Sequence, residues 1–239
     1  MKDLRKIIVE VLKKNPTLFY VCSRVRARLL SRGNTKRING RNRICIKNAI
    51  IRNTVFDIKG EDNLIEIEDG VVINKFLFFV TGSHHHFYIG RDCRINRGGS
   101  LWVEDDHCTL IIGDRTTIEE IHIGLTEPHS SIKIGRDCMI ANDVEIRCGD
   151  SHSIIDLQTK KRINYAEDVI IHDHVWISAH AAILKGSEIG SHSVIGNGAI
   201  VTKQVPPQVV VAGAPMRIIK TGITWQKDRV YDANVHKGT

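Results

Sequence analysis

The chain has 239 residues, a formal net charge of +7 and only 5% aromatic residues. This length allows one or two domains with a sizeable core, and the basic charge suits nucleic acid, a membrane surface or an anionic ligand. No nucleic-acid recognition motif accompanies the charge, so we expect no nucleic-acid partner. The most apolar run, residues 76–80, is too short to span a bilayer, and the charged N-terminus predicts no secretory signal.

Residues 1–32 have the pattern of helices. Apolar residues recur at helical spacing between positions 7 and 12 and again between positions 19 and 29. Pro16 predicts a break between two helices, and lysine and arginine are frequent around both apolar runs. We therefore expect residues 1–37 to form a helical cap on the rest of the chain. The basic surface leaves a second interpretation open, namely attachment to an anionic membrane face.

From about Ile38 onward, short β-rich segments replace the helical pattern. Residues 134–151 divide into three six-residue units, IGRDCM, IANDVE and IRCGDS, which each open with isoleucine. Upstream the spacing is less regular, because Ile112 and Ile134 are 22 residues apart instead of 18. The period of six returns over residues 171–205, where every unit opens with Ile or Val and has a small or β-branched residue in fifth place.

A period of six fits neither an α-helix nor a simple alternating strand, and it therefore indicates a repeat. Each unit supplies one short strand and one corner and buries little surface alone, so neighbouring units must stack into a solenoid. β-branched residues suit the strands. We predict an all-β solenoid over residues 38–212, followed by a C-terminal tail over residues 213–239.

One long insertion interrupts the repeat. Ile146 opens the last unit before the gap, yet the next opener, Ile171, follows 25 residues later instead of six. About 19 residues, near 150–168, must therefore leave the solenoid as a protruding loop. Long loops on a rigid scaffold often carry function, and this one starts with the sequence GDSHSI, which contains Asp150 and His152.

Six cysteines, at positions 22, 45, 93, 108, 138 and 148, show no Cys-x-x-Cys spacing. Cys93 and Cys138 occupy fifth places of repeat units, where small residues are needed. We expect reduced core thiols of a cytoplasmic protein, not a disulfide framework.

Five ordered motifs, GDSHSI, KKRIN, HVWIS, VTKQVPP and VAGAPMRIIK, resemble the hexapeptide-repeat acyltransferases. Within this family they are most similar to bacterial sugar O-acetyltransferases of capsule and lipopolysaccharide pathways, and the resemblance covers about residues 112–220. It implies a left-handed parallel β-helix, a homotrimer, and acetyl-CoA as the cosubstrate without a required metal. It also implies acetyl transfer to a hydroxyl of a sugar or surface-polysaccharide precursor in the cytoplasm, with contact to the inner membrane surface left open.

In that family the histidine that matches His152 is the general base, which takes a proton from the sugar hydroxyl as its oxygen attacks the thioester. Asp150 lies two residues away, so in an extended segment it would point to the same side and could orient the imidazole. A backbone carbonyl would serve equally well. Cys148 offers a rival mechanism through a Cys–His acyl-enzyme, but we expect a small solenoid residue there, because the family transfers acetyl directly.

Coenzyme A brings phosphates and a long pantetheine arm, and basic side chains suit phosphate. The resemblance assigns the following positions to this cosubstrate: Thr202 and Lys203 near the phosphates, Arg217 as a further basic contact, Ser178 and Ala179 along the pantetheine channel, and Trp176 packed beside the active site. Three consecutive acidic residues, Glu104, Asp105 and Asp106, could bind sugar hydroxyls or could form a solvated turn.

Other functions stay open at this point. A general base would also serve N-acetylation of an aminosugar. A non-catalytic solenoid, or a metal-dependent one similar to the hexapeptide carbonic anhydrases, is a further alternative, and the latter would draw on His172, His174 and His180. The run at 84–86 is expected to be an exposed turn, since three adjacent histidine side chains cannot converge on one ion.

Overall fold

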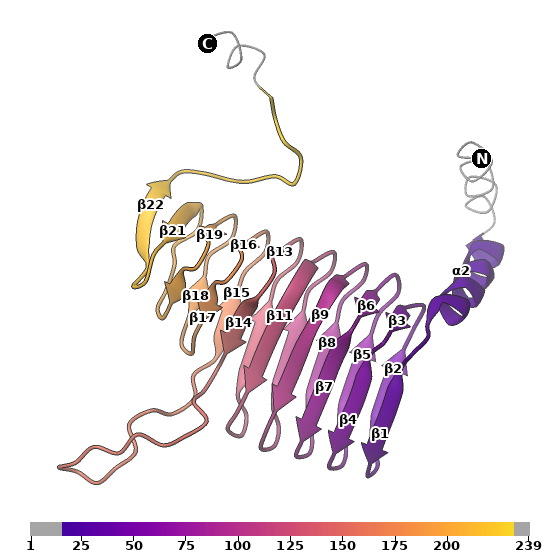
Figure 1. The fold of residues 1–239 in the computed structure, drawn as a ribbon, viewed down its shortest axis with the longest axis horizontal. Helices are drawn as coiled ribbons and strands as arrows, with labels where there is room; N and C mark the ends of the chain where they lie inside the picture. Colours follow the sequence, from indigo (N-terminus) through magenta and orange to yellow (C-terminus); the bar gives the residue numbers. More distant parts are fainter. Residues whose placement is uncertain (1–15, 232–239) are drawn as a thin grey trace.

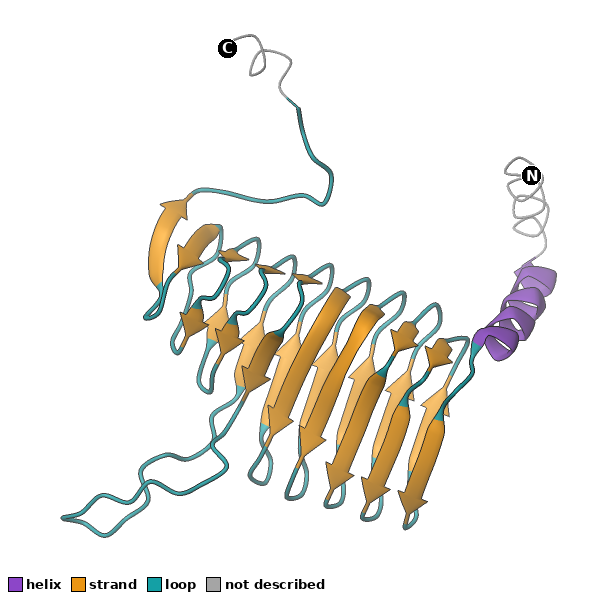
Figure 2. Cartoon of the chain, in the orientation of Figure 1, coloured by secondary structure: helices purple, strands orange, loops and turns teal. Residues whose placement is uncertain are grey.

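The β-rich segments wind into successive coils in a computed structural model that describes residues 16–231 (Figure 1). Strands of neighbouring coils pair in parallel along the whole solenoid. The helix α2 (Pro16–Leu30) lies at the N-terminal end, and short loops turn the chain at the corners of each coil (Figure 2). The predicted solenoid is confirmed. The helix expected between positions 7 and 12 lies outside the described residues.

Each coil places its strands on three faces. Face one consists of β2 (Arg43–Ile46), β5 (Leu64–Ile67), β8 (His86–Ile89), β10 (Thr109–Ile112), β12 (Ser131–Ile134), β15 (Val169–Ile171) and β18 (Glu188–Ile189). Face two consists of β3 (Ile50–Arg52), β6 (Val72–Asn74), the first parts of β9 (Arg94–Val103) and β11 (Thr117–Leu125), β13 (Met139–Ile140), β16 (Trp176–Ile177), β19 (Val194–Ile195) and β21 (Val209–Ala212). Face three consists of β1 (Thr35–Asn39), β4 (Val55–Lys59), β7 (Phe76–Thr81), the remaining parts of β9 and β11, β14 (Val144–Arg147), β17 (Ala182–Ile183) and β20 (Ile200–Val201).

The residues that open the six-residue units fill the interior. In the regular part of the repeat all of them are at most 1% exposed: Ile171, Ile177, Ile183, Ile189, Ile195 and Val201. The residues in fifth place lie at the corners, with their side chains buried as well. This burial explains why small side chains are needed there. Cys93 and Cys138 are buried at such places, and burial raises the pKa of their thiols to about 12 and about 11. Both thiols therefore stay protonated, as expected of core residues.

The length of a coil changes along the chain. Leu110 pairs with Ile132, which is 22 residues further on, whereas Ile177 pairs with Ile195, only 18 residues further on. The longer coils are upstream, where β9 and β11 continue from face two into face three without a break. The irregular spacing upstream of Ile134 thus reflects longer coils of the same solenoid.

The prediction of an exposed turn at residues 84–86 is wrong for His85, which is only 1% exposed. Its Nδ1 accepts the backbone N–H of Cys108 at 3.0 Å, and its Nε2 donates to the backbone oxygen of Thr81 at 3.1 Å. Burial lowers the pKa of His85, and only the neutral ring can accept one bond while donating the other. A polar corner is buried here because the preceding strand and the neighbouring coil each offer the ring one backbone partner.

The end of the solenoid differs from the simple tail that the sequence suggests. A further strand, β22 (Arg217–Thr221), pairs antiparallel with β21. Beyond it the chain returns to the coils, where the indole N–H of Trp225 donates to the backbone oxygen of His174 at 2.8 Å and the two rings stack. No helix within residues 16–231 is long and apolar enough to cross a membrane.

Candidate active site

The turns that join face three to face one stack along one edge of the solenoid, which we call the arm corner. These turns are residues 40–42, 60–63, 82–85, 104–108, 126–130, 184–187 and 202–204. At the same edge, between β14 and β15, residues 148–168 leave the coil as a protruding arm (Figure 1). The long insertion that the broken period indicates therefore lies in line with these turns.

Most candidate site residues of the sequence analysis come from the arm corner. They are Glu104, Asp105 and Asp106 in one turn, Asp150 and His152 in the arm, and Thr202 and Lys203 in the last turn. The turns with residues 104 and 202 belong to coils four strand spacings apart, which is roughly 19 Å. Coiling thus aligns on one edge residues that are widely separated in the sequence.

Two carboxylates of the acidic turn are used by the turns beside it. Asp106 accepts the backbone N–H of Ser83 at 2.7 Å, and Asp105 accepts that of Glu127 at 2.8 Å. These bonds tie three consecutive turns together. Of the three acidic residues, Glu104 alone lacks such a bond to a neighbouring turn among the described residues, and its carboxylate accepts an indole N–H on face three instead.

Asn164 holds the base of the arm together and is 7% exposed. Its Nδ2 donates to Asp150 Oδ2 and to the backbone oxygen of His152, both at 2.8 Å. Its Oδ1 accepts the backbone N–H of Ile154 at 2.7 Å. The amide therefore fixes the backbone at and after His152, while the His152 side chain is exposed.

Asp150 forms an ion pair with Lys185, whose Nζ lies 2.6 Å from Oδ2. The hydrogen bond from Lys185, followed by that from Asn164, holds the pKa of Asp150 below its ordinary value. Asp150 is therefore ionised at neutral pH. Within the described chain no hydrogen bond joins its carboxylate to the imidazole of His152, and Asn164 connects the two residues instead.

Arg162 anchors the returning half of the arm to the neighbouring turn. Its guanidinium bonds to the carboxylate of Glu127 and donates to the backbone oxygen of Asn164 at 3.0 Å. Glu127 also accepts the backbone N–H of Ala166 at 3.1 Å. Asn164, Arg162 and Lys185 were not predicted from the sequence. The KKRIN motif contains the first two, but Asn164 acts through bonds to the other half of the arm and Arg162 through a bond to the turn that contains Glu127.

A cavity of about 440 Å³ lies beside the base of the arm. Its lining contains three cations, Arg147, Lys185 and Lys203, and two carboxylates, Asp150 and Glu167, together with Thr202. The small net positive charge suits a ligand that carries phosphate. The cavity brings two of the expected cosubstrate residues next to a residue of the GDSHSI motif.

The other expected cosubstrate residues lie elsewhere on the same chain. Trp176 is on face two, Ser178 and Ala179 follow it at the corner between faces two and three, and Arg217 is in β22. The cavity beside the arm is lined by none of these four described residues. Within a single chain, the residues expected to form the site therefore lie at separate edges of the solenoid.

Cys148 is fully buried at the start of the arm. Burial raises the pKa of its thiol, so the thiol stays protonated at neutral pH and is a poor nucleophile. This environment does not favour an acyl-enzyme at Cys148.

The histidines of the last coils are directed to separate partners. His172 lies 2.8 Å from a carboxylate oxygen of Glu188, and His180 lies 2.8 Å from one of Asp143. His174 stacks on the tryptophan of the C-terminal segment. Within residues 16–231 no group of three histidine, cysteine, aspartate or glutamate side chains is arranged to hold a metal ion.

Comparison with known proteins identifies the family to which this solenoid belongs. Residues 168–203 match the family model "Bacterial transferase hexapeptide (six repeats)". A polysialic acid O-acetyltransferase of Neisseria meningitidis is 32% identical over 55% of this chain and 70% of its own length. The chain belongs to the hexapeptide-repeat acetyltransferases. Its solenoid is the left-handed parallel β-helix of that family.

Two further similarities concern the same kind of hexapeptide-repeat acetyltransferase. A polysialic acid O-acetyltransferase of Escherichia coli O1:K1 / APEC is 37% identical over 49% of this chain, a match that spans only 38% of the relative's length. The solved structure of the polySia-specific acetyltransferase NeuO superposes with a TM-score of 0.72 at 34% identity, and the match covers 84% of this chain and 85% of that one.

Proposed function

We propose that this protein is an acetyl-CoA-dependent O-acetyltransferase that modifies a hydroxyl of a sugar or of a surface-polysaccharide precursor. The observation that carries the proposal is the arm corner, where the GDSHSI segment with His152 stands beside a cavity lined by Lys185, Thr202 and Lys203. The similarity to polysialic acid O-acetyltransferases supports a glycan as the acceptor.

The proposed chemistry needs one proton acceptor. His152 removes the proton from the sugar hydroxyl while the oxygen attacks the thioester carbonyl of acetyl-CoA. The new C–O bond forms, the C–S bond breaks, and the leaving thiolate takes up the proton that the imidazolium releases. Asp150 keeps its negative charge throughout, because Lys185 and Asn164 already hold it. No covalent enzyme intermediate is required.

The test of this function is an acetyl-transfer assay across acceptor classes. Release of free thiol from acetyl-CoA should depend on adding a neutral sugar, a nucleotide sugar or a lipid-linked glycan, and mass spectrometry should find an ester. Transfer to an aminosugar with amide formation would favour N-acetylation instead. Loss of turnover in chelator, or no thiol release with any acceptor, would favour a metal-dependent or non-catalytic solenoid.

The proposed site is completed by a second copy of the chain in a homotrimer. Trp176, Ser178 and Ala179 lie away from the arm of their own chain, so a neighbour must supply them if they act with His152. The arm also exposes apolar side chains that a neighbouring solenoid would cover. These are Ile154 (56% exposed), Ile155 (47%), Leu157 (82%), Ile163 (61%) and Tyr165 (59%).

Mixed assemblies test this shared site. The single variants His152→Ala and Trp176→Ala should each be nearly inactive, whereas trimers assembled from both variant chains should regain activity. In a mixed cyclic trimer one of the three interfaces pairs an intact His152 with an intact Trp176, so activity should reach about one third of wild type. Light scattering should give the mass of three chains. A monomeric active enzyme, or mixtures without regained activity, would contradict the arrangement.

The basic residues of the proposed coenzyme site should contribute to affinity for CoA. Lys203→Glu and Arg217→Glu are each expected to weaken CoA binding about 10- to 100-fold, since a hydrogen bond to a charged group contributes roughly 1.5–3 kcal/mol. Calorimetry would measure this, with Lys133→Glu, an exposed lysine on face one, as the matched control. If these two side chains bind the 3′-phosphate, the substitutions should weaken the binding of dephospho-CoA less than the binding of CoA. Unchanged affinity in both variants would remove these two assignments.

The proposal includes a cytoplasmic location with peripheral contact at the inner membrane surface. All six cysteines are unpaired, and four of them are buried. Reduced thiols and a thioester cosubstrate both fit a reducing compartment.

A further inference from the structure

Helix α2 is attached to the first coil through small side chains. Ser23, Ala27 and Ser31 follow one another at intervals of four residues and so share one side of the helix. Ala27 is 6% exposed, and Ser31 Oγ accepts the backbone N–H of Ile51 at 3.0 Å. Asn48 Nδ2 donates to Ser23 Oγ at 2.6 Å. This side of α2 contributes contacts that are mostly small and polar.

Three large apolar side chains of α2 form a second stripe, which is exposed. Val21, Val25 and Leu29 also follow at intervals of four and are offset from the first stripe by two residues, about 200° around the helix. They are 51%, 54% and 75% exposed. An amphipathic helix of a globular protein normally turns its apolar stripe toward the core. In α2 this arrangement is reversed, so the helix presents apolar surface outward.

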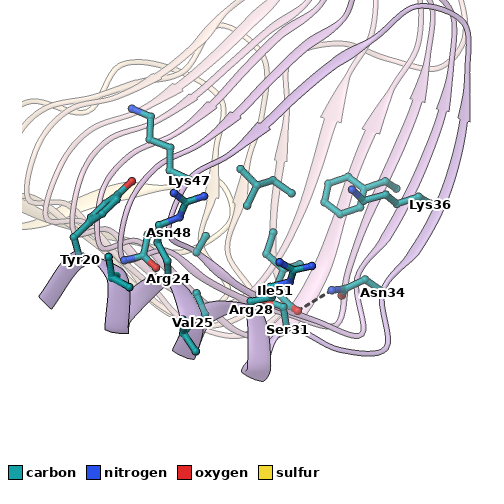
Figure 3. A pocket seen from close by; sticks show the side chains of 15 residues that line it. Tyr20, Arg24, Val25, Arg28, Ser31, Asn34, Lys36, Lys47, Asn48 and Ile51 are labelled. Atoms are coloured by element: carbon teal, nitrogen blue, oxygen red, sulfur yellow. Dashed lines mark hydrogen bonds between the residues drawn. The ribbon is translucent and has the colours of Figure 1, made fainter. Parts of the chain in front are cut away.

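A cavity of about 670 Å³ opens beside this stripe, between α2 and the first coil (Figure 3). Its floor consists of apolar side chains of the first coil, among them Ile46, Ala49 and Ile51, and of Phe56 in the next coil, and Val25 adds to its wall. The floor is accessible because the described chain places no coil before this one. Cavities of this size accommodate small organic ligands or part of a lipid tail.

Four cations border the cavity. Arg24 and Arg28 come from α2, and Lys36 and Lys47 come from the first coil (Figure 3). Lys47 is paired with Glu68 at 2.6 Å. No carboxylate within residues 16–231 lies within 4.0 Å of the other three cations, Arg24, Arg28 and Lys36. An apolar floor with a cationic border suits a ligand that combines an apolar tail with an anionic head.

The charges on the chain decide among the candidate occupants. Residues 1–15 contain five basic and two acidic residues, a net +3, and α2 itself contains three arginines and no acidic residue. The N-terminal segment or the α2 helix of a second copy would therefore bring like charge to a border that is already cationic. An anionic lipid surface supplies both missing partners, since its phosphates match the cations and its acyl chains match the apolar stripe.

We propose that α2 and the first coil form a docking surface for an anionic lipid bilayer, with Val21, Val25 and Leu29 inserted among the acyl chains and Arg24, Arg28 and Lys36 at the phosphates. The inference deepens the proposed membrane contact, and it is independent of the chemistry of acetyl transfer. Its effect is to hold the enzyme where membrane-bound acceptors are present.

Vesicle co-sedimentation of the full-length protein tests this surface. Binding to vesicles of phosphatidylcholine mixed with phosphatidylglycerol should exceed binding to phosphatidylcholine alone and should weaken as salt is added. The double variant Arg24→Glu/Arg28→Glu should bind at least about 25-fold more weakly, because each cation near an anionic surface contributes roughly a factor of five. Arg97→Glu, an exposed arginine on a distant strand, is the matched control and should bind like wild type.

The apolar part of the surface has its own variant. Val25→Asp/Leu29→Asp should lose binding to anionic vesicles even at low salt, whereas Val230→Asp, a 74% exposed valine in the C-terminal segment, should not. Inorganic phosphate at the concentration of the lipid phosphate should not release the protein, which separates a bilayer from a free anion. Equal binding to both vesicle types, or wild-type binding by both α2 variants, would overturn the proposal. All variants should still acetylate a soluble acceptor, so a failure here is distinct from a failure of the proposed reaction.

Discussion

Replacing His152 by alanine is expected to lower kcat by about 10²–10⁴-fold, the usual contribution of acid–base catalysis by a positioned side chain. The fold should be unaffected, because His152 is exposed and only its backbone oxygen is bonded by Asn164. Steady-state kinetics with acetyl-CoA and a responsive acceptor would measure the loss, and circular dichroism would check the fold. Wild-type turnover in this variant would exclude His152 as the base.

The pH dependence adds a second readout for the same residue. A general base acts in its deprotonated form, so the wild-type rate should rise with pH and the His152→Ala variant should lose that rise. Titration of Asp150 cannot cause this rise of the rate. Its pKa is lowered by Lys185, so its ion pair is fully formed above the ordinary carboxylate pKa, near 3.8, and is lost only in stronger acid.

Cys148→Ala is the control for the rival acyl-enzyme mechanism. Cys148 is fully buried and its thiol pKa is raised, so the variant should keep most of its activity. Mass spectrometry of the wild-type enzyme with acetyl-CoA alone should find no acetylated cysteine. An acetyl group on Cys148 that is then passed to an acceptor would contradict direct transfer.

Replacing Asn164 by alanine is expected to lower kcat by about 10²-fold, because a displacement of roughly 1 Å at a catalytic group can have an effect of that size. The variant removes the side-chain bonds to Asp150 and to the His152 backbone. The apparent affinity for CoA should change little. The rise of the rate with pH should persist at a lower plateau, since the base itself is still present.

A double variant separates positioning of His152 from a general loss of stability. If Asn164 acts through His152, then Asn164→Ala should have little further effect in a His152→Ala background. Thr159→Ala is the matched control on the arm, because among the described residues its hydroxyl bonds only within the outer turn, to Asp156 and to the backbone N–H of Lys161. Fully additive losses, or an equal loss in the Thr159 control, would show that Asn164 only maintains the arm.

The sequence predicts the regular part of the fold well because its information is local. The openers from Ile171 to Val201 recur every six residues, and all of them are buried. The gap between Ile146 and Ile171 marks the arm for the same reason, since a fixed period makes any insertion visible. Period alone therefore suffices to place the candidate base, His152, on the largest interruption of the solenoid.

Features that depend on contacts between distant positions of the chain could not be predicted. Asn164 draws its importance from two segments of the arm, and Lys185 reaches Asp150 from 35 residues further along the chain. His85 looks like part of a polar surface turn, yet its partner Cys108 belongs to the next coil. Trp225 packs against His174 across 51 residues. Each of these contacts joins positions whose separation follows no period in the sequence.

The parallel stacking of coils also sets a fixed distance between the first coil, on which α2 packs, and the arm. The arm leaves the coil that contains β14. Along this face β14 lies five strand spacings beyond β1 of the first coil, and strands are about 4.8 Å apart, which makes roughly 24 Å. If α2 lies on a bilayer, the arm can stand no more than about this height above the first coil. An acceptor anchored in that bilayer would have to extend about as far to reach the arm, so the number of coils would determine which part of a growing glycan is acetylated.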